Sequence, residues 1–293
     1  MLASVGSPAA VDNFTIDLTH GLGHMIELVD QTQLPVHEEY PRLAESLGIS
    51  LNALKSLQRA WTKSFDWSVE QAALNRYHQY TATVEDITVY HIHQKSGDPN
   101  AIPLILNRGW PGSFLEFIPL IDPLTTVSHT SSGDTVSFDV VVPSLPGYVF
   151  SSVPPVNWTL DDTARILNTL MTDVLGYKVF ATHGTDWGSV VAYSMYDNFN
   201  MTVGAAQLCA IPFRPLSDDE IAARNIKLDP DAQFQQDRLL QLETTRSGYN
   251  VEQSTKVVAD HTRGSKPAYS QCTNASSSLT PLASHCLIIL SDS

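Results

Sequence analysis

Residues 183–189 read His-Gly-Thr-Asp-Trp-Gly-Ser and lie between two apolar segments. The preceding segment, 178–182, has the composition of a buried strand, and the following segment, 190–195, has that of a helix. Small residues surround Asp186, so the stretch predicts a sharp strand–turn–helix connection that exposes this one side chain above the carboxyl end of a sheet. An aspartate held there can attack carbon and form an alkyl ester, which makes Asp186 the candidate nucleophile.

Short apolar segments recur through the middle of the chain and predict further buried strands. They lie at 104–106, 138–142, 179–181 and 203–206. Stretches with helical spacing separate them, at 114–121, 160–175 and 189–196. Buried strands that alternate with helices predict an α/β fold with a mostly parallel sheet.

The N-terminal part of the chain has a different pattern. Residues 20–31 and 36–48 show helical spacing, and Ser50 is a suitable N-cap for a helix that continues to Trp61. Residues 81–95 alternate between polar and β-branched or aromatic side chains, which predicts paired strands. We therefore expect a helical extension followed by the first strands of the sheet.

The charge and the cysteines narrow the class of protein. A formal net charge of −14 over 293 residues disfavours nucleic acid and anionic membrane surfaces as partners. Cys209, Cys272 and Cys286 show neither a disulfide framework nor zinc spacing, which suits a reducing compartment. The N-terminus lacks the features of a signal peptide, and no apolar run reaches the roughly 18 residues of a membrane span. We expect a cytoplasmic protein.

Two histidines raise the question of a metal site. His91 and His93 fall on the same face of one expected strand. A zinc site needs at least a third ligand, and no such ligand is evident, so a structural role is favoured. We expect neither a metal nor a cofactor.

Two further motifs and several N-terminal segments share the order and spacing of a known family. Residues 108–117 read Arg-Gly-Trp-Pro-Gly-Ser-Phe-Leu-Glu-Phe, and residues 145–152 read Leu-Pro-Gly-Tyr-Val-Phe-Ser-Ser. These motifs, with segments between 48 and 80, resemble the oxyanion loop, the next loop and the N-terminal extension of microsomal-type epoxide hydrolases. The resemblance runs from about residue 14 to 256. It implies an α/β-hydrolase fold with a helical N-terminal extension and a partial lid.

The resemblance also implies roles for particular residues. Asp186 would be the nucleophile, and the backbone N–H groups of Trp110 and Trp187 would form the oxyanion hole. Tyr249, in a lid segment, would donate a proton to the epoxide oxygen. The Trp110–Pro111 bond would be cis. The substrate would be a small apolar epoxide, and the oligomeric state is not specified.

The sequence departs from the family in two places. Arg108 replaces the histidine of the oxyanion loop. No motif after Lys256 matches the second lid tyrosine, the carboxylate or the catalytic histidine, and neither His261 nor His285 lies in a matching context. We therefore expect a C-terminally truncated chain that opens an epoxide but hydrolyses the ester slowly or not at all.

Four regions follow from these patterns. They are an N-terminal extension with the first core strands (1–98), the α/β-hydrolase core (99–216), a partial lid (217–256) and an atypical tail (257–293). With the last core strands missing, the strand at 203–208 is expected to be an open edge. The apolar segment 286–290 is a candidate substitute strand for that edge.

Other functions remain open at this point. A haloalkane dehalogenase would use the same aspartate, but Tyr249 favours the epoxide. A non-catalytic module would bind small apolar ligands, and a partner chain would be a further source of the missing elements. A serine hydrolase is disfavoured because the chain has no Gly-x-Ser-x-Gly motif.

Overall fold

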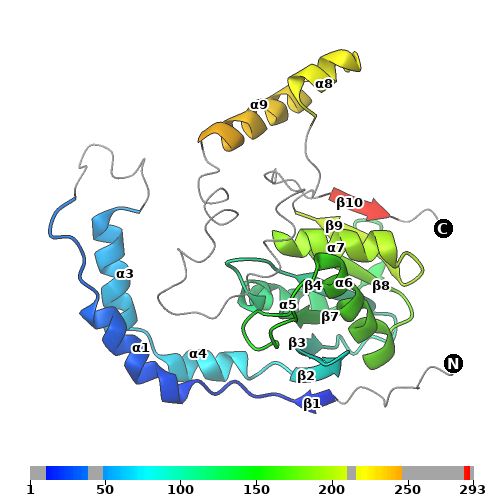
Figure 1. The fold of residues 1–293 in the computed structure, drawn as a ribbon. Coiled ribbons are helices and arrows are strands. Elements are labelled where there is room, and N and C mark those ends of the chain that lie inside the picture. The colour runs from blue at the N-terminus through cyan, green and yellow to red at the C-terminus, as the bar shows by residue number, and fades with distance from the viewer. Residues whose placement is uncertain (1–10, 39–48, 210–215, 246–286, 291–293) are drawn as a thin grey trace. The chain divides into compact units, whose positions relative to one another are not determined.

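The computed structural model describes residues 11–38, 49–209, 216–245 and 287–290 (Figure 1). The chain divides into two compact units. The smaller unit is Thr15–Tyr77, and the larger one combines Met1–Phe14 with His78–Ser293.

The larger unit is built on an eight-stranded sheet with the order β1-β2-β3-β7-β4-β8-β9-β10. Four neighbouring strands, β7, β4, β8 and β9, run parallel, and the pairings on either side of them are antiparallel. The strands are β1 (Val11–Asn13), β2 (Gln79–Val84), β3 (Ile87–Gln94), β4 (Ile102–Asn107), β7 (Phe138–Pro143), β8 (Phe180–Gly184), β9 (Val203–Leu208) and β10 (Leu287–Leu290). The predicted α/β fold with a parallel central sheet is confirmed. A separate hairpin pairs β5 (Ser128–His129) with β6 (Thr135–Val136).

Helices connect the parallel strands, as the sequence predicted. They are η1 (Phe114–Phe117), α5 (Ile118–Thr125), α6 (Leu160–Thr169) with its π-helical continuation η2 (Leu170–Val174), and α7 (Trp187–Asn198). A capping box, in which Thr159 and Asp162 exchange hydrogen bonds, begins α6. Figure 1 shows α7 beside β8 and β9, which it contacts, and α6 packs on α7. This packing fixes α7, and with it the turn at Asp186. Two further helices follow, α8 (Asp218–Ala223) and α9 (Pro230–Thr245).

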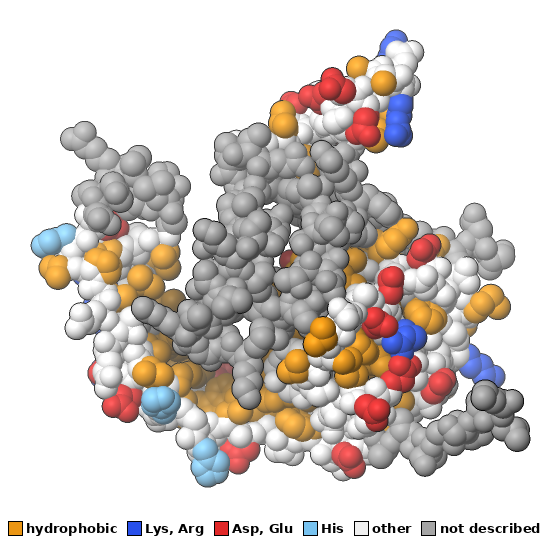
Figure 2. Space-filling model, viewed as in Figure 1, with side chains coloured by type: hydrophobic (Ala, Val, Ile, Leu, Met, Phe, Trp, Pro, Cys, Tyr) orange, Lys and Arg blue, Asp and Glu red, His pale blue; other side chains and the backbone are white. Residues whose placement is uncertain are grey.

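The core of the larger unit lies between the sheet and these helices. Its fully buried side chains include Tyr90, Ile92, Ile105, Leu167, Met171 and Phe180. On the face drawn in Figure 2, acidic side chains outnumber basic ones, in keeping with the net charge of −14. Among the helices that the structure describes, none combines the length and apolar character needed to cross a membrane.

Strand β9 is not the open edge that we expected. Residues Leu287–Leu290 pair with it antiparallel, with Leu287 opposite Leu208 and Leu290 opposite Ala205. The prediction that the apolar segment 286–290 docks there as a substitute strand is confirmed for 287–290, while Cys286 lies outside the described residues. An antiparallel neighbour satisfies the N–H and C=O groups that an edge strand otherwise exposes.

The smaller unit contains α1 (Thr19–Gln31), α3 (Leu51–Lys63) and α4 (Trp67–Leu74). The Ser50 side chain accepts a hydrogen bond from the Ala53 N–H, so the predicted N-cap is confirmed. The Gln58 amide donates to two carbonyls at the end of α1, those of Val29 and Thr32, each at 2.8 Å. These bonds hold α3 against α1. Most of the helix expected at 36–48, residues 39–48, lies outside the described residues, and residues 36–38 are not helical.

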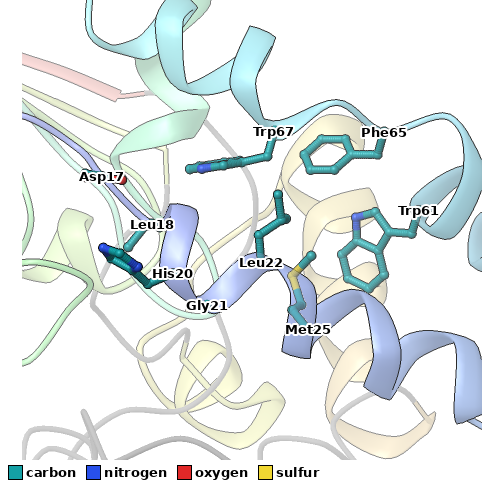
Figure 3. A pocket seen from close by; sticks show the side chains of 9 residues that line it. All are labelled: Asp17, Leu18, His20, Gly21, Leu22, Met25, Trp61, Phe65 and Trp67. Carbon is teal, nitrogen blue, oxygen red and sulfur yellow. The ribbon is translucent and has the colours of Figure 1, made fainter.

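An apolar cavity of about 540 Å³ opens within the smaller unit (Figure 3). Trp61, Phe65 and Trp67 line one side, and Leu22 and Met25 of α1 face them. All of the lining residues belong to 15–77, so this cavity contains none of the residues of the turn at Asp186.

His91 and His93 are tied into the larger unit by separate contacts. The ring of His91 is fully buried and stacks on Tyr80 at 5.7 Å between centroids. His93 Nε2 lies 2.8 Å from the Tyr177 hydroxyl, which donates to Asp139 at 3.0 Å. Burial lowers the pKa of both histidines to about 4. Both are therefore neutral in the folded protein near pH 7.

These buried histidines predict acid sensitivity. An unfolded histidine titrates near pH 6.5, so between about pH 6.5 and 4 the unfolded chain binds protons that the folded chain does not. The free energy of unfolding should therefore fall as the pH falls through this window. We expect His93→Gln to reduce that fall by roughly 1 kcal/mol between pH 7 and 5, measured by urea unfolding at each pH. The exposed His129 is the matched control, and a His93→Gln slope equal to that of His129→Gln contradicts the prediction.

Candidate active site

Asp186 lies at the sharp turn between β8 and α7, with φ 54° and ψ −132°. A positive φ is unfavourable for a residue with a Cβ, so the surrounding contacts must hold this conformation. The Ser189 N–H donates to the Asp186 carbonyl at 2.9 Å, and the Ser189 hydroxyl donates to the Gly184 carbonyl at 2.6 Å. The predicted strand–turn–helix connection is thus present, and its side chain projects from a constrained backbone.

Three glycines allow the backbone to pass close to this turn. A Cβ added to Gly184 would overlap the Gly188 carbonyl, and one added to Gly188 would overlap the Asn107 carbonyl. A Cβ added to Gly109 would overlap the Asp186 carboxylate and the Trp187 backbone nitrogen. The loop after β4 therefore lies in direct contact with the Asp186 side chain.

This loop runs from Arg108 to Ser113 and contains the Trp110–Pro111 bond, which is cis as predicted. The Ser113 side chain accepts a hydrogen bond from the Leu115 N–H at 3.3 Å, so it caps η1. Arg108 Nε forms an ion pair with Glu116 in η1. Both ends of the loop, Arg108 and Ser113, are thereby bonded to residues of η1.

The groups around Asp186 shift the pKa of its carboxyl group in opposite directions. Burial raises the pKa of its carboxyl group above the ordinary value. The nearby N–H groups of Trp187 and Trp110 and the charge of Arg108 lower this pKa, whereas the charge of Glu116 raises it. Oδ1 of Asp186 is buried and completes no hydrogen bond of normal geometry within the part of the chain that the structure describes. The carboxylate is therefore only partly stabilised, as a nucleophile requires.

Trp110 and Trp187 contact both the hydrophobic core and the Asp186 carboxylate. Their half-buried side chains pack against the main hydrophobic core. Their backbone N–H groups approach the Asp186 carboxylate. Two donors in such a place are suited to stabilise an oxyanion on that carboxyl group.

His183 lies three residues before Asp186, on β8. Its ring meets that of Phe117 edge to face, with centroids 5.7 Å apart. Burial lowers the pKa of His183, and a hydrogen bond with Gln207 of β9 raises it. The imidazole links β8, β9 and η1 in its neutral form.

Two families together match most of the chain. The family described as "Epoxide hydrolase N terminus" matches residues 11–117, and "alpha/beta hydrolase fold" matches residues 102–247. The chain belongs to the epoxide hydrolase family.

Individual relatives agree with this assignment. A "Putative epoxide hydrolase" of Stigmatella aurantiaca (strain DW4/3-1) is 34% identical over 151 residues, which cover 51% of this chain and 34% of the relative. "Epoxide hydrolase 1" of Sus scrofa is 34% identical over 153 residues, covering 50% and 34%. The solved Aspergillus niger epoxide hydrolase has a TM-score of 0.70 at 27% identity and covers 86% of this chain and 65% of that one. The matched part of the chain thus spans about a third of the length of these curated relatives.

The structure does not describe the remaining predicted site residue or the two histidines that follow it. Tyr249, His261 and His285 all lie outside the described residues. The structure therefore joins Asp186 to the loop of Trp110 and leaves the predicted role of Tyr249 as a prediction. Within the described ranges, no group of three His, Cys, Asp or Glu side chains has the arrangement of a metal site.

Two features of the site were not anticipated from the sequence. The first is the contact of Gly109 with the Asp186 carboxylate, and the second is the ion pair between Arg108 and Glu116. A glycine beside Trp110 is a weak signal, because glycine is common in loops of every kind. The charges at 108 and 116 lie eight positions apart, a spacing that predicts no contact in a loop.

Gly109→Ala tests the close approach in this epoxide hydrolase fold. The added methyl group should overlap the Asp186 carboxylate and lower the free energy of unfolding by about 1–3 kcal/mol, measured by urea unfolding. Gly204→Ala is the control in the same unit, because its Cβ would meet only a Val179 methyl at 3.1 Å and Val179 is exposed. Equal stability of the two variants would show that the loop does not lie against Asp186.

Proposed function

We propose that this chain opens small apolar epoxides by attack of the Asp186 carboxylate, which forms a covalent alkyl ester. The observation that carries the proposal is the contact of the Gly109 loop with a carboxylate held at a positive-φ turn. The N–H groups of Trp110 and Trp187 beside that carboxylate add to it. Family membership supports the same chemistry, because one matching family is the epoxide hydrolase N terminus and the other is the α/β-hydrolase fold.

In the first step an Asp186 oxygen attacks an oxirane carbon. The carbon–oxygen bond of the ring breaks, and its electron pair moves to the departing oxygen. That oxygen takes a proton from a donor, for which Tyr249 is the candidate on the grounds of resemblance. The product of this step is a hydroxyalkyl ester of Asp186.

In the second step water attacks the ester carbonyl. The charge that develops on the carbonyl oxygen would be stabilised by the N–H groups of Trp110 and Trp187, a contribution typically worth about 3 kcal/mol per donor. Collapse of this intermediate releases a diol and restores the Asp186 carboxylate. A general base for the water typically contributes about 10²–10⁴-fold.

The raised pKa of Asp186 sets the pH dependence of the first step. Only the ionised carboxylate attacks, and burial shifts its titration to higher pH than that of an exposed aspartate. Ester formation should therefore decline on acidification at a higher pH than for an ordinary carboxylate. Partial removal from water also makes the ionised form more reactive.

For the 293-residue chain by itself, we propose that the second step is slow. The reason lies in the sequence, where no motif after Lys256 matches that of the family's catalytic histidine. His261 and His285 remain the candidates, and both lie outside the described residues. This part of the proposal is independent of the part that concerns ester formation.

Intact mass after incubation with a small aryl epoxide tests both parts. We expect a mass increase of one epoxide per chain, located on Asp186 by peptide mapping, with little diol released. Asp186→Asn should form no adduct, because an amide is a poor nucleophile. Asp197→Asn is the matched control, since Asp197 is an exposed aspartate on α7, the helix that begins directly after Asp186.

Each other outcome has a definite meaning. Steady diol formation would support ester formation and overturn the slow second step. An adduct from a chloroalkane but not from an epoxide would favour a dehalogenase. The absence of any adduct from a folded chain would contradict the proposed chemistry and favour a ligand-binding role.

A further inference from the structure

The loop that touches Asp186 is joined to η1 by a charged pair. Arg108 is the first residue after β4, and its Nε is bonded to a carboxylate oxygen of Glu116. The Arg108 side chain is only 21% exposed, whereas that of Glu116 is 49% exposed. The guanidinium therefore lies on the protein side of the pair, where solvent screens its charge less than that of its partner.

Gly112 provides the surface on which the pair rests. A Cβ at Gly112 would overlap both the Glu116 carboxylate and the Arg108 guanidinium. Arg108 precedes Gly109, the residue in contact with the Asp186 carboxylate, and Trp110 follows it. The loop from Arg108 to Ser113 thus contains one member of the ion pair, the glycine on which the pair packs and the N–H group that approaches the Asp186 carboxylate.

We propose that the Arg108–Glu116 ion pair is a positioning device for the attack by Asp186. It holds the Gly109–Trp110 backbone against this carboxylate, and the more buried guanidinium keeps the carboxylate in its ionised form. Arg108 and Glu116 are positioning residues, because they act through the loop and through their charges. The inference rests on the proposed function and adds the residues that regulate its first step.

The charges near Asp186 determine in which direction each substitution should shift its pKa. Among the described residues, the charges that act on its pKa are those of Arg108, which lowers it, and Glu116, which raises it. His183 on β8 contributes no charge near neutral pH, because burial lowers its pKa. The two members of the pair therefore have opposite effects on the ionisation of Asp186, although removing either one breaks the same contact.

Arg108→Gln and Glu116→Gln separate an electrostatic role from a merely structural one. Each variant breaks the ion pair, so a structural role alone predicts the same loss for both. The rate of ester formation falls on the acidic side of its pH profile, which is called the acid limb. The proposal predicts that this acid limb moves to higher pH in Arg108→Gln and to lower pH in Glu116→Gln. On that acid limb, Arg108→Gln should form the ester about tenfold more slowly than wild type.

The measurement is the rate of adduct formation with a small aryl epoxide, by intact mass, as a function of pH in the full chain. Arg108→Lys keeps the charge and should preserve the position of the acid limb. Glu85→Gln is the matched control, because it breaks another Glu–Arg ion pair, that of Glu85 with Arg165. It should leave the acid limb unchanged.

A second readout separates this inference from the proposed function. The titration of the Asp186 carboxyl carbon, followed by ¹³C NMR and assigned by its loss in Asp186→Asn, requires no reaction. Opposite movements of this titration in the two variants, with no ester in any protein, would support the charge effect and refute the proposed chemistry. Ester formation in wild type with both variants moving the same way, or neither moving, would overturn the inference alone. If Arg108→Gln does not fold, Arg108→Lys and Glu116→Gln still decide the direction.

Discussion

The close approach of three backbone segments at Asp186 is the constraint on which the rest of the structure depends. The end of β4, the end of β8 and the start of α7 meet there without side chains between them, because Gly109, Gly184 and Gly188 have no Cβ. The parallel pairing of β4 with β8, in which Asn107 lies opposite Gly184, brings the two strand ends to the same edge. The Thr185 N–H then donates to the Asn107 carbonyl at 3.0 Å and closes the turn.

The same close approach also brings together the groups that raise and lower the pKa of Asp186. A carboxylate taken fully out of water without partners would be protonated and inert. One left fully in water would be well solvated and weakly nucleophilic. The half-buried Asp186, with two backbone N–H groups and one guanidinium nearby, lies between these extremes. The positive φ of the residue is maintained by the same contacts that set its charge.

The rest of the larger unit supports this turn. Helix α7 is held by β8, β9 and α6, so its N-terminus cannot move without disturbing the core. Strand β10 protects β9 from the other side, and an antiparallel strand can do so without the crossover helix that a parallel strand needs. The smaller unit has its own helical contacts and its own apolar cavity. The family match to residues 11–117 covers this unit together with the first strands.

The sequence by itself determined the local elements. Its small residues around Asp186, its alternating apolar segments and the cap at Ser50 predicted the turn, the parallel centre and the first of the strong helices. These signals are local, because a strand, a turn or a cap depends on residues within a few positions of one another. The motif at 108–117 added the oxyanion loop by resemblance.

Only the tertiary structure decided what acts on Asp186. Gly109, Arg108 and Glu116 lie some seventy positions or more away in the sequence, and their contact with the turn follows from the pairing of β4 with β8. The antiparallel docking of β10 on β9 joins segments still further apart. Burial and charge–charge effects depend on which surfaces the fold brings together, and no local periodicity records them. For this reason the candidate nucleophile could be predicted from the sequence, whereas the surroundings that shift its pKa could not.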